Sequence, residues 1–482
     1  MAELWQIFSP YLLLVYYLGV FFVVVNILLE NRNPLKAYSY LLLLLLLPFI
    51  GMVIYLFFGR NHRKRKIFSK RQLINTAFGQ KYVDEHLDKS HRVDTDDLPV
   101  SGFSKLIHFL NKDLSPLTDN NRVQVLRNGE EKYPAILEAM SNAKSHIHLE
   151  YYIMTEEGIG EAIEKVLVQK AREGVEVRVI VDAVGSFTLS KAFFNRLKEA
   201  GVEIFEFMPV RFPTFASKIN YRDHRKILIV DGTVGFTGGI NLDNRYSNEL
   251  NEQYWRDTHL KFEGEIVKTL QLLFFLNWQF VSEQSWMPSK DYFPQLPNLG
   301  KQCVQINASG PDWELASIMD SFMLAINSAQ HFIRIATPYF IPNESILNSL
   351  TTTARSGVDV QLMIPYESDS RVVQWASLSF ITELLTSGVQ VFLYQKGFLH
   401  TKVMVVDGTF AAVGTANMDY RSFDLNYEVN AYLYDVELAE TLNRQFEEDK
   451  TDCLKVSLAQ WRERPLREKL AESVSRLLAP LL

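Results

Sequence analysis

Two stretches of the chain share one frame: DHRKILIVDGTVGFTGGINLD, Asp223 to Asp243, and LHTKVMVVDGTFAAVGTANMD, Leu399 to Asp419. Both read His-x-Lys, four residues, Asp-Gly, and then a run of small residues that closes on Asn. A single His-x-Lys pattern usually indicates only a strand at the protein surface, without a functional role. Two extended copies in one chain of 482 residues indicate an internal duplication.

The duplication extends beyond these frames. Three earlier segments recur in the same order: 142–154 with 327–340, 171–182 with 354–365, and 200–207 with 387–394. Residues 146–152 and 176–182 are strand-like, and residues 160–173 have apolar positions at helical spacing. Alternating strands and helices predict α/β domains built on βαβ units. We expect a first domain at 121–295, a second at 296–482 with a C-terminal helix, and a spacer at 61–120.

The N-terminus carries two charge-free runs, Tyr11 to Leu29 and Tyr38 to Phe58. Each is about long enough to cross a bilayer as a helix. A cleaved signal peptide would have a basic start and a small-residue cleavage site, and the first run has neither. Two such runs so close together argue against core helices. Residues 1–60 therefore predict a transmembrane helical hairpin.

Orientation follows from the basic segment GRNHRKRKIFSKR, Gly59 to Arg71, which contains no acid. Lys and Arg are retained in the cytoplasm, so we expect both termini and the catalytic domains on that side of a bacterial cell membrane. The segment could also bind anionic head groups, or serve as a topology anchor alone.

Composition excludes some classes. The formal charge of −6 weighs against non-specific nucleic-acid binding. The two cysteines, Cys303 and Cys453, are isolated, which fits a reducing compartment and suggests neither a disulfide framework nor a zinc site. His146 and His148 could in principle share a metal, but a buried strand is the favoured interpretation. We expect no metal and no cofactor.

Strand geometry separates the roles within each frame. Side chains alternate between faces, so His224 and Lys226 share a face, whereas Asp231 has the opposite parity. The Asp is better placed to organise the turn or to pair with a nearby cation. If the halves pair about a pseudo-twofold axis, two His and two Lys meet at one site. Such a set suits a phosphodiester: lysines neutralise charge, one histidine attacks phosphorus, and the other transfers protons.

These residues resemble the signature of the phospholipase D superfamily, HxKxxxxD followed by small residues and Asn. Gly239 and Thr415 stand where that family usually has Ser. The resemblance implies a mixed-sheet fold of two tandem domains flanked by helices. It also implies catalytic and substrate-binding residues in both copies: His224, Lys226, Asp231, Asn241, His400, Lys402, Asp407 and Asn417.

The whole chain resembles the bacterial cardiolipin synthases of that superfamily, over the second apolar segment and the stretches WRDTHLKFEGEIVKTLQLLFFLNW and TANMDYRSFDLNYEVN. The resemblance implies transfer of a phosphatidyl group between two phosphatidylglycerol molecules, giving cardiolipin and glycerol, with His224 as nucleophile. A hydrolase that releases phosphatidic acid is the alternative. It also implies an acid behind each histidine: Glu428, and either Asp257 or Glu252.

The C-terminal segment RPLREKLAESVSRLLAPLL has apolar residues at helical spacing: Leu466, Leu470, Val474, Leu477 and Leu481. Two interpretations remain open. The helix either packs on the second domain or lies at the membrane interface near the site.

Overall fold

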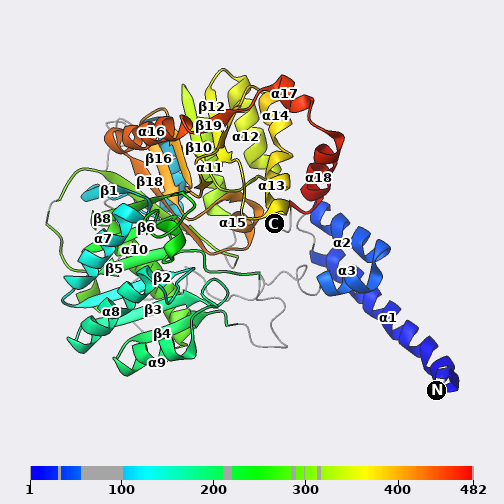
Figure 1. Ribbon diagram of the computed structural model, residues 1–482, viewed down its shortest axis with the longest axis horizontal. Coiled ribbons are helices and arrows are strands. Elements are labelled where there is room, and N and C mark those ends of the chain that lie inside the picture. The colour runs from blue at the N-terminus through cyan, green and yellow to red at the C-terminus, as the bar shows by residue number, and fades with distance from the viewer. Residues whose placement is uncertain are drawn as a thin grey trace.

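The computed structural model describes residues 2–30, 34–55, 101–113, 115–209, 220–283, 289–297, 299–311 and 316–479. The basic segment 59–71 lies outside these residues. Two sheets with their covering helices form the body of the molecule, and the N-terminal helices extend from one side of it (Figure 1).

The first sheet has seven strands in the order β1-β8-β6-β5-β2-β3-β4. Strands β2, β3 and β4 run parallel, and the other neighbours pair antiparallel. This mixed order is what two βαβ crossovers followed by a hairpin produce. The bounds are β1 (Asn121–Arg127), β2 (His146–Tyr151), β3 (Glu176–Asp182), β4 (Glu203–Phe207), β5 (Lys226–Val230), β6 (Val234–Gly238) and β8 (Thr258–Gly264).

The second sheet repeats this order and adds one edge strand: β19-β13-β12-β10-β15-β16-β18-β9. Its central strands β10, β12 and β13 are parallel, as in the first sheet. The bounds are β9 (Cys303–Ser309), β10 (Phe332–Ala336), β12 (Asp359–Pro365), β13 (Gln390–Tyr394), β15 (Val403–Val406), β16 (Phe410–Gly414), β18 (Glu428–Tyr434) and β19 (Cys453–Lys455). The match of strand to strand confirms the predicted duplication.

Each repeated frame forms a hairpin: β5 and β6 in the first half, β15 and β16 in the second. Asp231 and Gly232 both have positive φ, 53° and 63°, as do Asp407 and Gly408, 52° and 64°. Asp-Gly is the favoured pair for such a turn, because its backbone twist matches that of the flanking strands.

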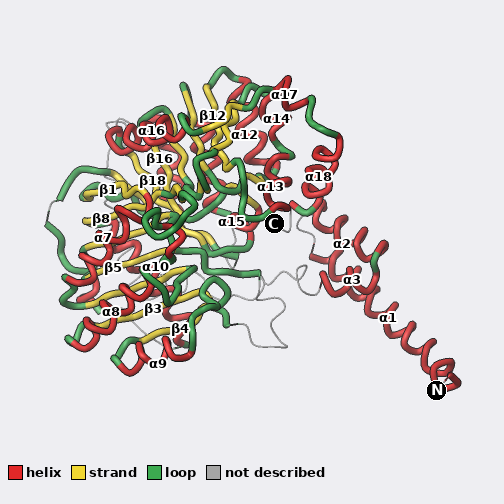
Figure 2. Tube along the Cα trace, in the orientation of Figure 1, coloured by secondary structure: helices red, strands yellow, loops and turns green. Residues whose placement is uncertain are grey.

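Helices cover the outer faces of the sheets, while strands occupy the interior (Figure 2). They are α7 (Asn128–Ser141), α8 (Ile159–Arg172), α9 (Lys191–Glu199), α10 (Ile266–Ser282), α11 (Ser317–Ser328), α12 (Glu344–Arg355), α13 (Arg371–Leu378), α14 (Ile381–Thr386), α15 (Tyr420–Asp424), α16 (Val436–Lys450), α17 (Leu458–Arg462) and α18 (Leu466–Leu477).

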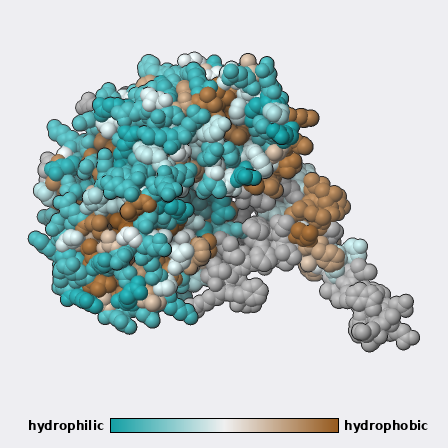
Figure 3. Space-filling model, viewed as in Figure 1, coloured by the Kyte–Doolittle hydropathy of each residue, from teal (hydrophilic) through white to brown (hydrophobic). Residues whose placement is uncertain are grey.

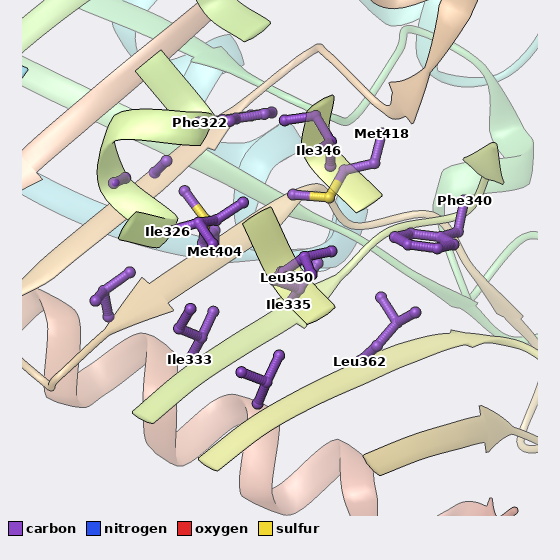
Figure 4. Packing of buried hydrophobic residues seen from close by; sticks show 14 of the residues in the cluster. Phe322, Ile326, Ile333, Ile335, Phe340, Ile346, Leu350, Leu362, Met404 and Met418 are labelled. Carbon is purple, nitrogen blue, oxygen red and sulfur yellow. The ribbon is translucent and has the colours of Figure 1, made fainter. Parts of the chain in front are cut away.

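One apolar core is shared by the two halves. Ile227 and Phe262 of the first sheet belong to the same buried cluster as Val405, Val413 and Val429 of the second. The halves therefore meet face to face at β5, β8, β15, β16 and β18, a set that includes strands of both repeated frames. A separate core of the second domain packs α11 and α12 on β10, β12 and β15, with Phe322, Ile335 and Met404 in one buried cluster (Figure 4).

Part of the segment that we expected to be a spacer joins that second core. Helix α6 (Ser104–Lys112) buries Leu106, Ile107 and Leu110 in the cluster that contains Ile326 and Tyr432. The chain thus contacts its second domain before it enters the first.

The N-terminal runs form α1 (Ala2–Glu30), α2 (Pro34–Leu46) and α3 (Pro48–Ile54). Pro48 interrupts the helix within the second run and begins α3, because proline removes a backbone donor. Within the described part of the chain, no helix combines the length and the apolar character that crossing a bilayer requires. The predicted hairpin across the membrane is therefore not shown by the structure.

Helix α18 packs on α13 of the second domain, as one of the two interpretations required. Glu472, Ser475 and the following Ala479 are the buried residues of this segment. Leu466, Leu470, Val474 and Leu477 are exposed on the other side. The apolar stripe therefore does not supply the packing.

Candidate active site

His224 lies at the entrance to β5 and is held there by the other half of the chain. Its N–H donates to the carbonyl of Tyr427 at 2.9 Å, and the N–H of Tyr427 donates to the carbonyl of Arg222 at 2.9 Å. Asp223 pairs with Tyr427 as an isolated parallel bridge. Glu428 is the next residue, so this short ladder brings it to the imidazole.

His400 repeats the arrangement in reverse. Strand β14 (Phe398–Leu399) pairs in parallel with β7 (Trp255–Arg256), and the His400 N–H donates to the carbonyl of Arg256 at 2.8 Å. Asp257 follows Arg256, as Glu428 follows Tyr427. Each histidine segment therefore adds a strand to the acid-bearing segment of the opposite half.

Each histidine therefore bonds a carboxylate of the opposite half, an arrangement that we call the exchange of carboxylates. The Nδ1 atom of His224 lies 2.9 and 3.0 Å from the two oxygens of Glu428. The Nδ1 atom of His400 lies 2.7 Å from Oδ2 of Asp257. An Nδ1–H that donates to a carboxylate leaves the lone pair on Nε2. Glu252, the alternative acid, is exposed and has no part in this cluster.

Each carboxylate has its own support. Glu428 also accepts hydrogen bonds from the hydroxyl of Thr415 and from the side-chain amide of Asn426, at 3.1 Å for Asn426. Asp257 accepts from the N–H of Thr258 at 2.7 Å. A Cβ at Gly239 would stand 2.0 Å from Oδ1 of Asp257. The Thr415 hydroxyl, at the position of the family's usual Ser, therefore contacts the acid, and Gly239 makes room for one.

The two lysines are buried beside their histidines. Lys226 Nζ donates to the carbonyl of His224 at 2.8 Å, and Lys402 Nζ donates to the carbonyl of His400 at 2.6 Å. Lys402 Nζ also lies 3.1 Å from Nδ1 and 3.3 Å from Nε2 of the His400 ring. Both ammonium groups thus sit beside their histidines, as the shared strand face predicted.

Electrostatics join the four residues into one site. Burial lowers the pKa of Lys226 to about 7 and that of Lys402 to about 8, and the Lys402 charge further lowers the pKa of Lys226. Burial and the lysines lower the pKa of His224 to about 4 and that of His400 to about 3. Lys402 acts on His224, and Lys226 on His400, across the domain boundary. Without a bound anion, both imidazoles are neutral near pH 7.

Asp231 and Asp407 do not join this cluster. They follow β5 and β15 at the end away from the histidines, about 20 Å along an extended chain of seven residues. Asp231 accepts from the backbone N–H groups of Lys144, Ser145 and His146 at 2.7–2.9 Å. Asp407 accepts from the backbone of Gln330, His331 and Phe332 at 2.7–2.8 Å. This placement fits the turn-organising role that strand parity favoured.

The two asparagines differ. Asn241 is bonded within its own half, to the Tyr246 hydroxyl and the N–H of Ile153. The side-chain oxygen of Asn417 is buried and has no hydrogen-bond partner among the described residues. An unpaired buried oxygen is costly, so Asn417 is the better candidate for a contact with substrate.

Several residues of the site have no signal in the sequence. Lys132 of α7 is buried, and its Nζ donates to the carbonyls of Ile240 and Asn241 at 3.0 and 3.2 Å. The rings of Tyr152 and Tyr246 stand edge-on to His224 and His400, at 5.0 and 5.3 Å between centroids. Neither frame contains Lys132 or Tyr152, so only the folded chain brings them here.

His146 and His148 lie in the buried strand β2, as expected. The side chain of Gln271 bonds both, Oε1 lying 3.2 Å from Nε2 of His146 and Nε2 lying 2.7 Å from Nδ1 of His148. Burial lowers the pKa of His148 to about 3. Over the described ranges, no group of three or more His, Cys, Asp or Glu side chains is arranged to hold a metal ion.

Comparison with known proteins follows the same two halves. The family model described as "Cardiolipin synthase, PLD-like domain" matches residues 136–273 and 323–450. The cardiolipin synthase of Geobacillus sp. (strain WCH70) is 41% identical over 470 residues, covering 96% of this chain and 92% of that protein. The chain belongs to this phospholipase D-like family of cardiolipin synthases.

Further matches agree with this membership. A model described as "Phospholipase D-nuclease N-terminal" matches residues 18–60. The probable cardiolipin synthase YwiE of Bacillus subtilis (strain 168) is 40% identical over 98% of this chain and 93% of that protein. The solved phosphatidylserine synthase of Haemophilus influenzae Rd KW20 has the same fold, with a TM-score of 0.60 at 16% identity over 79% of this chain and 100% of that chain.

Proposed function

We propose that the protein is a phosphatidyltransferase that joins two phosphatidylglycerol molecules into cardiolipin and releases glycerol. The observation that carries the proposal is the exchange of carboxylates: His224 bonds Glu428 and His400 bonds Asp257, each across the boundary between the halves. A chain that belongs to the cardiolipin synthase family and keeps both His-Lys pairs in this setting has the groups that the reaction needs.

In the first step, Nε2 of His224 attacks phosphorus of one phosphatidylglycerol. A P–N bond forms as the bond from phosphorus to the head-group glycerol oxygen breaks, and His400 donates a proton from its Nε2 to that oxygen. Lys226 and Lys402 neutralise charge on the non-bridging oxygens. The substrate's negative charge offsets the lysines and raises the proton affinity of His400, so this ring enters the step as an imidazolium that carries the proton on Nε2.

In the second step, a terminal hydroxyl of another phosphatidylglycerol gives its proton to His400 and attacks phosphorus. The P–N bond breaks, and His224 returns to its neutral form. Water in place of this hydroxyl would release phosphatidic acid. Transfer therefore requires that the lipid acceptor reach the phospho-histidine before water does.

The experiment supplies purified full-length protein with phosphatidylglycerol and separates cardiolipin from phosphatidic acid. Cardiolipin should dominate, and His224→Ala and His400→Ala should each abolish it. Phosphatidic acid as the main product would favour the hydrolase. Near-normal turnover in either variant would refute the shared site. Mapping the trapped phosphate tests the roles, since phosphate on His400 would reverse them.

The N-terminal segments provide the membrane attachment in this proposal. The apolar runs 11–29 and 38–58 form a hairpin, and the basic residues after it keep the domains in the cytoplasm. A single cysteine introduced within residues 31–35 should react with an impermeant reagent from outside intact cells. Reaction only after permeabilisation would contradict the hairpin.

A further inference from the structure

Helix α18 presents an apolar stripe to the outside of the protein. Leu466 is 80% exposed, Leu470 63% and Leu477 75%, and Val474 between them is 52% exposed. At 100° per residue these four fall within one narrow sector, opposite the buried Glu472 and Ser475. An ordinary surface helix buries its leucines, so this helix is docked with its polar face inward.

The inward face is firmly held. Glu472 forms an ion pair with Arg464, with 3.0 Å between Oε2 and Nη2. Arg476 stacks on the Phe380 ring, 4.2 Å from its centroid, and pairs with Glu383 at 3.3 Å. Because these contacts fix the rotation of α18 on the second domain, the outward direction of the leucines is a property of the fold.

Charge is distributed to match an anionic surface. Glu472 is buried, and Glu468, one turn earlier on the side opposite the stripe, is half-buried. The cations Arg467 and Lys469 flank the stripe on either side. Apolar residues bordered by Lys and Arg are the pattern of helices that lie in the interface of an anionic bilayer.

The surroundings have the same character. Val372 and Trp375 of α13, which packs on α18, are each 37% exposed. In Figure 1, α18 and the apolar helices α1 to α3 are on the same side of the body, and apolar colour gathers along this edge in Figure 3. A bilayer that contains the N-terminal apolar runs would therefore lie on the same side of the protein as the exposed stripe of α18.

The stripe is also connected to the active site. Asp369, just before α13, accepts a hydrogen bond from the Tyr339 hydroxyl at 2.7 Å. The Tyr339 ring lies 6.5 Å from that of Phe398, which lies 5.9 Å from the His400 ring. A bilayer in contact with α18 would thus lie near the side of the active site that holds His400.

We propose that the exposed stripe Leu466, Leu470, Val474 and Leu477, with its flanking cations, is a docking surface for an anionic lipid bilayer. It seats the second domain on the membrane so that lipid substrate reaches His400 without leaving the bilayer. This role rests on the proposed function, whereas the docking itself does not require turnover.

The experiment uses the full chain with Cys453→Ser and Val474→Cys, labelled with a polarity-sensitive fluorophore; the remaining Cys303 is buried. The protein is reconstituted in vesicles that contain brominated phosphatidylglycerol, or brominated phosphatidylcholine alone. We expect strong bromine quenching with phosphatidylglycerol. The double change Leu470→Asp and Leu477→Asp should reduce this quenching at least about tenfold. Moving one leucine side chain from water into the bilayer contributes roughly a factor of ten to the binding constant.

Leu454→Asp, at a half-exposed leucine on β19, is the matched control and should leave quenching unchanged. The double variant should keep the parent's melting temperature, lose activity on vesicles, and retain activity on monomeric short-chain phosphatidylglycerol. Absence of quenching in the parent would overturn the proposal, as would a chain dimer that the double variant dissociates. Quenching in a protein that makes no cardiolipin would refute the proposed function and leave the docking surface intact.

Discussion

Replacing Gly239 by alanine should disable His400 without touching it. The new Cβ would stand 2.0 Å from Oδ1 of Asp257, 2.7 Å from its Cγ and 2.8 Å from its Oδ2. Asp257 is wholly buried and is fixed by the N–H of Thr258 at 2.7 Å. Even a tight contact of 3.0 Å with the methyl group requires the carboxylate to retreat by about 1 Å, which stretches its 2.7 Å bond to Nδ1 of His400 beyond hydrogen-bond length.

A displacement of about 1 Å at a catalytic group costs on the order of 10²-fold in rate. We therefore expect kcat to fall by about that factor with KM little changed, because the substrate-binding groups stay in place. Overpacking should also lower the free energy of unfolding by about 1–3 kcal/mol. Steady-state kinetics on phosphatidylglycerol and denaturant unfolding measure the two effects separately.

Gly102→Ala is the matched control, since nothing lies within 4 Å of the position that its new methyl group would take, and both quantities should stay at the parent's values. Full kcat in folded Gly239→Ala would refute the reasoning. A raised KM with unchanged kcat would instead place Gly239 in the substrate subsite.

Three further outcomes follow from the site. Glu428→Gln should lower kcat about 10²-fold because the charge that orients and stabilises the His224 imidazole is lost; a change no larger than that of Asn426→Ala would contradict this role. Asp231→Ala should lower the free energy of unfolding by about 1–3 kcal/mol through three unpaired N–H groups, yet leave kcat per folded molecule unchanged. The pKa of Lys226, about 7, predicts that kcat/KM falls as pH rises through that value, because the charged ammonium is the form that binds phosphate. Lys226→Arg should move this alkaline limb upward, and an unmoved limb would assign it to another group.

The fold was predictable because its evidence is local and repeated. Strand-like and helix-like segments at 146–152, 160–173 and 176–182 appear as β2, α8 and β3, and both Asp-Gly pairs form hairpin turns. Strand parity alone separates His224 and Lys226 from Asp231. Each of these inferences depends on neighbours within about a dozen residues.

The parts that could not be predicted depend on contacts between distant segments. Glu252 matched Glu428 by its distance from the histidine, Asp257 matched by its setting in RDTHLKF, and only the bridge between β7 and β14 selects Asp257. Lys132 precedes the first frame by some ninety residues. It reaches the site because α7 places its Nζ atom against the carbonyl of Ile240 in that frame. Helical spacing in α18 located the apolar stripe but could not say whether it faces inward, since rotation about a helix axis is set by its partners.

The exchange of carboxylates explains why duplication preserved both copies of the frame. Within one half, the histidine and the acid are on different segments, and each pairs with the other half: His224 with Glu428, and His400 with Asp257. A single half would leave its imidazole without the carboxylate, and its carboxylate without the imidazole, that each has in the whole chain. The halves are nevertheless not interchangeable, because Thr415 bonds the longer Glu428 while Gly239 leaves the space that Asp257 occupies. Two support geometries of this kind allow the two histidines to hold different protonation states in one reaction, which nucleophilic attack and proton donation require at the same moment.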